Sequence, residues 1–197
     1  MTGSSVVLLV TLAILAIVLY NNIEAFDTDV SYIKSSDGRT YLVLNKPDKQ
    51  AAVENLSRLR IKLEKFVEHL RNKKVTCKED TQCVQRLKER FKAVLYESKP
   101  DARYTSYTVN KGTKIYMCLR HEDKIIDENT QFFVALHELA HVMTVSLDHS
   151  PEFWRNFKIL LKHAIEDGFY QYRAYHKNPV GYCGTKISDT PHKAGSR

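Results

Sequence analysis

Residues Phe132–Met143 read FFVALHELAHVM, and this stretch decides how the rest of the chain is interpreted. It holds one His-Glu-x-x-His pattern inside an almost wholly apolar run. On an α-helix, His137 and His141 lie one turn apart on the same face, where two imidazoles can bind one metal ion. Glu138 lies about 100° further round the helix, which suits a carboxylate that takes a proton from water rather than one that binds the metal. The stretch therefore predicts a buried helix with the side chains that a zinc hydrolase needs.

The alternative interpretation is a pair of core histidines that are hydrogen-bonded to the backbone. A chance match to the pattern in a chain of this length has a probability on the order of 1%. Burying two imidazoles and a carboxylate also costs free energy unless a partner satisfies them. Both considerations favour a metal site.

A third metal ligand is expected beyond this helix. Ser150 is a favoured N-cap and Pro151 a favoured first helical residue, so a new helix begins here and the first ends near Thr144–Val145. His149 stands directly before the new helix, where it can fold back toward the metal. Two carboxylates remain as alternative third ligands, namely Glu152 and Glu166.

The same residues carry a resemblance to a known family. The pattern His137–His141, followed by His149 four residues before Phe153, resembles the WLM and SprT-like zinc metallopeptidases. The stretch Ser106–Trp154 is similar to small predicted metallopeptidases of large DNA viruses and some protists. In WLM proteins the spacer before the third histidine is usually shorter and contains a glycine, which residues 142–148 lack.

The resemblance covers roughly Tyr104 to Cys183 and implies a minimal zincin-like metalloprotease fold. We expect an α+β domain over residues 26–185 that contains this fold and an added helical hairpin. The resemblance implies that His137, His141 and His149 bind Zn²⁺. It also implies that Glu138 is the catalytic base that activates water for hydrolysis of a protein or peptide substrate. An oxyanion that forms during peptide hydrolysis needs a donor. Tyr182 is the candidate that we select, although spacing does not distinguish it from Tyr170, His163 and His176.

The N-terminus predicts a membrane segment. Residues 2–23 carry no charged side chain, and the apolar centre 6–20 with its small flanking residues reaches the roughly 20 residues that a membrane span needs. A cleaved signal peptide is the alternative, but a basic start is missing and the small-residue site near Ala25 is poor. We expect residues 1–25 to be a single-pass anchor that contacts the membrane through residues 4–23, with its orientation left open. A secreted or lumenal protein is the alternative.

The remaining elements follow from local patterns. Strands are expected at residues 30–33 and 40–44 around the turn Asp37-Gly38, and at residues 105–109 and 113–119 around Asn110-Lys111-Gly112. Helices are expected at residues 47–72 and 81–96, forming an antiparallel hairpin. An apolar stripe on the first helix favours packing inside the domain over a coiled coil; it consists of Ala52, Leu56, Leu59, Leu63, Phe66 and Leu70. Residues 186–197 are expected to be a disordered tail.

Charge and cysteines leave several partners open. The net charge of +7 is spread along the chain, so nucleic acid is compatible with it but is not favoured. In an oxidising compartment, Cys77 can pair with Cys83 and Cys118 with Cys183; in the cytosol all four are expected to be free thiols.

The sequence thus predicts a membrane-anchored zinc metallopeptidase. One alternative is a non-catalytic zinc-binding interaction protein on the same fold, which Glu138 argues against because a structural zinc site does not need that carboxylate. The other is a DNA-protein-crosslink-type protease, which the expected N-terminal anchor argues against.

Overall fold

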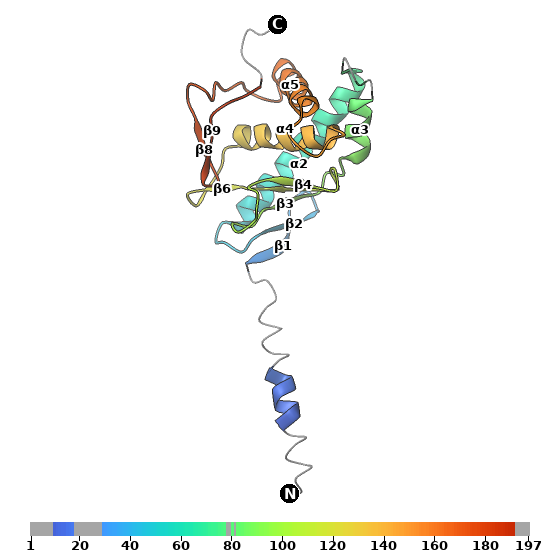
Figure 1. The fold of residues 1–197 in the computed structure, drawn as a ribbon. Coiled ribbons are helices and arrows are strands. Elements are labelled where there is room, and N and C mark those ends of the chain that lie inside the picture. Colours follow the sequence, from blue (N-terminus) through green and yellow to red (C-terminus); the bar gives the residue numbers. More distant parts are fainter. Residues whose placement is uncertain (1–9, 18–28, 78–79, 81, 192–197) are drawn as a thin grey trace, which may run out of the picture.

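The computed structural model describes residues 10–17, 29–77, 80 and 82–191. Strands form one layer and helices pack on one side of it (Figure 1). The strand β1 (Val30–Lys34) pairs with β2 (Thr40–Leu44) in antiparallel register, and β2 contacts β3 (Leu95–Glu97). The strand β3 runs parallel to β5 (Lys114–Met117), which pairs on its other side with antiparallel β4 (Tyr107–Val109). The three-stranded order β3-β5-β4 leaves β4 at an edge.

Four helices build the other layer. They are α2 (Lys49–Asn72), α3 (Cys83–Arg90), α4 (Glu128–Met143) and α5 (Pro151–Glu166). The helix α4 contacts the three other helices and the strands β4 and β5, so it lies at the centre of the molecule. All six residues of the predicted stripe on α2 are buried. The stripe therefore packs inside the domain, as predicted.

Two short hairpins complete the chain, β6–β7 (Arg120–His121 with Lys124–Ile125) and β8–β9 (Val180–Tyr182 with Thr185–Ile187). Disulfides join Cys77 to Cys83 and Cys118 to Cys183, the two pairings considered from the sequence. The second one fastens the β8–β9 hairpin to the end of β5. Because β9 includes Lys186 and Ile187, the predicted disordered tail begins too early, and residues 192–197 of it lie outside the described residues.

The predicted transmembrane helix is corrected by the structure. Among the described residues, no helix is both long enough and apolar enough to cross a membrane. Residues 10–17 are helical. The fold class with an N-terminal transmembrane helix and the single-pass localisation are therefore wrong, and the membrane contact through residues 4–23 is not supported. The rest of the predicted anchor, residues 1–9 and 18–25, lies outside the described residues.

The second predicted helix is also too long. The helix α3 ends at Arg90, and Ala93 adopts a left-handed conformation with φ of 54°. Residues 95–97 then form β3, whose parallel pairing with β5 is a contact between distant parts of the chain. Burial of Leu95 against the helices outweighs the helical periodicity that residues 81–96 show in isolation.

Candidate metal centre

The central helix α4 begins and ends at defined caps. The Asp127 side chain accepts a hydrogen bond from the Thr130 backbone N–H (3.1 Å), and Arg173 donates to the same carboxylate (3.0 Å). At the other end, the Thr144 hydroxyl donates to the Ala140 carbonyl (2.6 Å) and its backbone becomes extended. Ser150 then caps α5 by accepting from the Phe153 N–H, with Pro151 as the first helical residue, as predicted. Residues 144–150 thus form a short loop between two capped helices.

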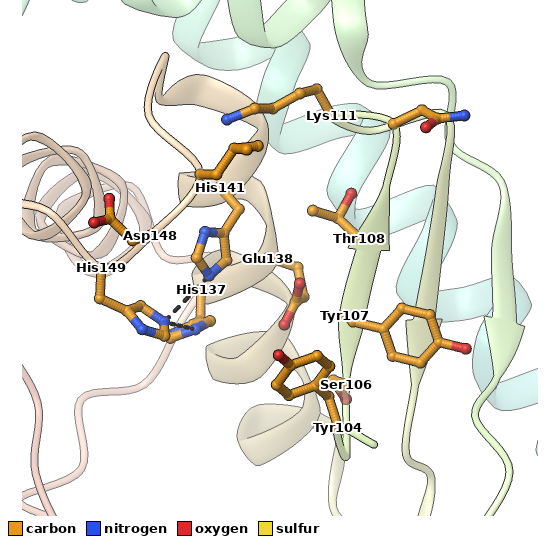
Figure 2. Close-up of a pocket in the computed structure, with 12 residues that line it drawn as sticks. Tyr104, Ser106, Tyr107, Thr108, Lys111, His137, Glu138, His141, Asp148 and His149 are labelled. Atoms are coloured by element: carbon orange, nitrogen blue, oxygen red, sulfur yellow. Dashed lines mark hydrogen bonds between the residues drawn. The ribbon is translucent and has the colours of Figure 1, made fainter. Parts of the chain in front are cut away.

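Three histidines meet at this loop. His137 and His141 project from one face of α4, and His149 turns back from the loop toward them (Figure 2). The Nε2 atom of His149 lies 3.1 Å from that of His137 and 3.2 Å from that of His141. Three nitrogens that bind one ion tetrahedrally at about 2.0–2.1 Å are roughly 3.3 Å apart. The three side chains therefore form a group that could hold a metal ion.

The two alternative third ligands are used elsewhere. The Glu152 carboxylate accepts a hydrogen bond from the Val145 backbone N–H (3.0 Å). Glu166 lies beside Lys162 and His163 at the far end of α5. Of the three candidates for the third ligand, the structure brings only His149 to the two helix histidines.

The environment keeps the helix imidazoles neutral. Burial, together with the neighbouring His141 and His149, lowers the pKa of His137 to about 3. Burial, His149 and Lys111 lower the pKa of His141 to about 4. Neutral imidazole is the form that binds a metal ion, so both side chains are available as ligands at neutral pH.

The Glu138 carboxylate has an unpaired oxygen. The residue is 3% exposed, and its Oε2 atom has no hydrogen-bond partner. Burial raises the pKa of this carboxyl to about 8. A buried polar atom without a partner is rare in folded proteins and calls for an explanation. A cation held by the three Nε2 atoms, with a water molecule in the cleft as the partner of the carboxylate, would explain the unpaired oxygen. The residues present therefore fit a zinc site.

A cleft of about 770 Å³ opens in front of these residues. Its helix side is formed by the three histidines, Glu138 and residues 147–148 of the loop. Its other side is formed by the edge strand β4 and the residues around it, Tyr104, Ser106, Tyr107, Thr108, Asn110 and Lys111. Figure 2 shows Tyr104 and Thr108 across the cleft from Glu138. The position of Tyr104 at the cleft was not predicted, because no local pattern distinguishes one tyrosine among eleven.

The loop that carries His149 is held by Lys111, a residue that sequence reasoning also missed. This lysine stands in the β4–β5 turn, and its Nζ atom donates to three carbonyl oxygens of the loop, those of Thr144, Val145 and Ser146. Glu152 holds the same loop by accepting from its N–H groups. A cation on the carbonyls and a carboxylate on the amides thus fix the loop from two sides.

The predicted oxyanion donor Tyr182 does not line the cleft. Its side chain is buried, its hydroxyl donates to the Cys118 carbonyl (3.2 Å), and the Ser106 hydroxyl lies 2.7 Å away. Burial raises its pKa, and Glu138 lies close enough for that carboxylate to raise the pKa as well. Tyr170, His163 and His176 do not line the cleft either. Tyr170 is buried in the core, where its hydroxyl donates to Tyr175. Two tyrosines line the cleft, Tyr104 and Tyr107, and Figure 2 shows the ring of Tyr107 turned away from Glu138.

Comparisons with known proteins give viral relatives and partial structural neighbours. No family model matches the chain. The uncharacterized protein 136R of Invertebrate iridescent virus 6 is 35% identical over 95 residues, which cover 46% of this chain and 51% of that protein. A crystal structure of a Wss1 mutant from Saccharomyces cerevisiae has a TM-score of 0.47 at 24% identity, covering 65% of this chain and 92% of that chain. Wss1 from S. pombe has a TM-score of 0.43 at 26% identity, covering 62% and 87%.

The expected similarity to viral proteins extends over nearly the whole chain. The uncharacterized protein R325 of Acanthamoeba polyphaga mimivirus is 34% identical over 182 residues, which cover 90% of this chain and 92% of that protein. At this identity and coverage, the chain belongs to the same family as mimivirus protein R325.

Proposed function

We propose that this protein is a zinc-dependent metallopeptidase whose ligands are His137, His141 and His149. The observation that carries the proposal is the meeting of three Nε2 atoms, 3.1–3.2 Å apart, beside a buried carboxylate with an unpaired oxygen. A structural zinc site has four protein ligands as a rule, whereas a catalytic site has three and an open position. The open cleft in front of the three nitrogens supports the catalytic interpretation.

In the proposed mechanism, Glu138 moves the proton. Bound Zn²⁺ would act as a Lewis acid that lowers the pKa of a water molecule and polarises the substrate carbonyl. Glu138 accepts a proton from the attacking water at Oε2 and donates it to the leaving amine nitrogen. Without a metal ion, burial raises the pKa of Glu138 to about 8. A cation bound at the neighbouring histidines would favour the carboxylate form, which is the form that accepts the proton.

The edge strand β4 is the proposed guide for the substrate backbone. It pairs with β5 on one side, and in the described sheet its other side carries no strand. An extended polypeptide can add to such an edge through backbone hydrogen bonds without a requirement for a particular sequence. Because β4 lines the cleft opposite Glu138, the bound chain would lie between the strand and the three histidines. Tyr104 is the side chain best placed to donate a hydrogen bond to the developing oxyanion.

The test compares the full chain with its Glu138→Gln variant, both loaded with zinc, on an unfolded protein substrate. We expect both proteins to bind one zinc ion and the variant to cleave about 10²–10⁴-fold more slowly. The matched control is Glu122→Gln, because the Glu122 side chain is 86% exposed and should leave the rate unchanged.

Other outcomes identify the alternatives. Equal rates for wild type and Glu138→Gln would show that this carboxylate is not the base. Zinc binding without cleavage by the wild type would favour the non-catalytic interaction protein. Cleavage only when DNA is added would indicate the DNA-protein-crosslink-type protease.

A further inference from the structure

A second cavity shares His137 with the cleft. Its volume is about 330 Å³. The helix α4 contributes Phe133 and His137, the helix α5 contributes Trp154 and Phe157, and residues 189–191 close the remaining side. We name this cavity the aromatic pocket. Nothing in the proposed mechanism uses it, although it adjoins the candidate metal centre.

The walls of the aromatic pocket are apolar, and their side chains pack against the protein core. The rings of Phe133 and Phe157 are 5.3 Å apart, and both residues are nearly fully buried. Phe133 also packs against Tyr175, at 4.8 Å between ring centroids, which fixes it from the core side. A pocket with such walls keeps its shape without a ligand, which reduces the entropic cost of binding.

Trp154 forms the rim of the pocket and is unusually exposed. The residue is 46% exposed, although tryptophan is a large aromatic residue that proteins mostly bury. Its ring lies 5.8 Å from that of His149 and 6.4 Å from that of Phe157. It is the single tryptophan of the chain. The rim residue therefore touches one proposed zinc ligand, while the wall residue Phe157 touches another, His137 (5.3 Å between ring centroids).

We infer that the aromatic pocket is a subsite for a large apolar side chain of the polypeptide substrate, next to the bond that is cleaved. This inference rests on the proposed peptidase function. The imidazole of His137 borders both the cleft and the aromatic pocket. When the carbonyl of the cleaved bond lies at the three Nε2 atoms, a substrate side chain next to that bond is therefore within reach of the pocket. Aromatic and long aliphatic side chains match the lining rings. The exposed Asp189 carboxylate at the edge disfavours acidic side chains.

The first experiment measures binding and does not require catalysis. Two decapeptides are used, one with a single Phe in a Gly-Ser background and one with Ser in place of that Phe. They are added to the full-length Glu138→Gln protein while the emission of Trp154 is recorded. We expect a saturable blue shift with the Phe peptide and a Kd at least about tenfold lower than that of the Ser peptide, since burying one Phe side chain favours binding by about that factor or more.

The second experiment measures specificity. Wild type, Trp154→Ala and Tyr32→Ala, each loaded with zinc, digest an unfolded protein of known sequence, and mass spectrometry maps the cleaved bonds. We expect large apolar residues to be enriched at one fixed position beside the cut in wild type and Tyr32→Ala. We expect this enrichment to fall several-fold in Trp154→Ala and to return in Trp154→Phe. Tyr32 is the control because it is also an exposed aromatic residue, 68% exposed, but lies on β1 and lines neither cavity.

The two experiments separate the subsite from the peptidase function. Cleavage without enrichment, or enrichment that is unchanged in Trp154→Ala, would overturn the subsite and leave the peptidase proposal intact. If no protein cleaves, the peptidase proposal fails and the binding experiment decides on its own. Equal affinity for the Phe and Ser peptides would then show that the pocket does not bind apolar side chains.

Discussion

Two buried polar clusters in this molecule differ in how completely their hydrogen bonds are satisfied. In the first, here the Asp37 cluster, one carboxylate oxygen accepts hydrogen bonds from Tyr41 (2.5 Å), Ser57 (2.8 Å) and Arg60 (2.9 Å). In the second, the candidate metal centre, three ring nitrogens face one another and the Glu138 Oε2 atom has no partner. The Asp37 oxygen is satisfied by side chains of the protein itself, whereas the Glu138 oxygen has no partner among the described residues.

An unsatisfied atom alone does not mark a functional site, because Asn55 and Gln131 also have a buried oxygen without a hydrogen-bond partner. What distinguishes the candidate metal centre is that such an oxygen lies beside three converging ring nitrogens.

The largest expected effect comes from breaking the complete cluster. The Arg60 and Asp37 side chains are only 7% and 9% exposed, so Arg60→Met leaves a buried carboxylate without its cation. We expect a loss of about 3–5 kcal/mol in the free energy of unfolding, measured in urea. Arg58→Met on the same helix is the control, because its ion pair with Glu128 is more than half exposed and contributes less than about 1 kcal/mol. Similar losses in both variants would show that the Asp37 cluster does not contribute as a buried pair.

The incomplete cluster should contribute to stability only when its ion is present. At free zinc about 100-fold above Kd, we expect the free energy of unfolding of the wild type to rise by about 2.7 kcal/mol. His149→Ala should lose most of this gain, and His176→Ala, which changes an exposed histidine away from the cleft, should keep it. Thermal unfolding with and without zinc measures both. If zinc stabilised wild type, His149→Ala and His176→Ala equally, the ion would be bound at another site.

A smaller effect is expected from the residue that fixes the third histidine. Lys111→Met removes the donor to the loop carbonyls but leaves all three imidazoles in place. Groups that orient metal ligands typically change metal affinity 10–100-fold. We expect an effect near the lower limit, about tenfold, measured by competition with a zinc chelator. Lys114→Met, an exposed lysine on the same hairpin, should leave the affinity unchanged. An unaltered affinity in Lys111→Met would mean that the loop holds its shape without the lysine.

The smallest effect is the pH dependence of the complete cluster. Burial alone would raise the pKa of Asp37, but hydrogen bonds from Tyr41, Arg39, Ser57 and Arg60 outweigh it and hold the pKa far below its ordinary value. A carboxyl with a lowered folded-state pKa stabilises the protein above its unfolded-state pKa near 4, and this stability is lost as the pH falls further. The difference in stability between wild type and Asp37→Asn should be constant from pH 7 to 5. It should then shrink by at most about 1.4 kcal/mol per pH unit below pH 4. A difference that shrinks between pH 7 and 5 would contradict the lowered pKa.

The metal side of the cleft could be predicted from the sequence because its determinants are local. His137 and His141 are one helical turn apart, and Ser150-Pro151 fixes the start of α5 just after His149. The three consecutive left-handed residues Asn110, Lys111 and Gly112 likewise produce the predicted β4–β5 turn. Each of these features depends on a few neighbouring residues, and patterns of that length determine caps, turns and helix faces.

The β4–β5 hairpin on the strand side was predicted, but its contacts with the rest of the molecule could not be, because they join residues that are distant in the chain. The parallel pairing of β3 with β5 joins segments about twenty residues apart, and it replaced a predicted helix. The hydrogen bonds of Lys111 reach residues more than thirty positions away. Tyr182 does not line the cleft, and its hydroxyl instead lies 2.7 Å from that of Ser106, a lining residue 76 positions earlier in the chain. A sequence pattern can show that suitable residue types are present, but it does not show which residues far apart in the chain come into contact.

The Cys118–Cys183 disulfide has a topological consequence. It closes a covalent ring of the backbone that contains α4, α5 and all three histidines, while β4 and the rest of the sheet lie outside this ring. One backbone cut anywhere between the two cysteines opens the ring but leaves both pieces joined through sulfur. A molecule that is nicked once in this region, by itself or by another protease, would therefore keep its mass on a non-reducing gel, apart from the added water. It would separate into two fragments only after reduction.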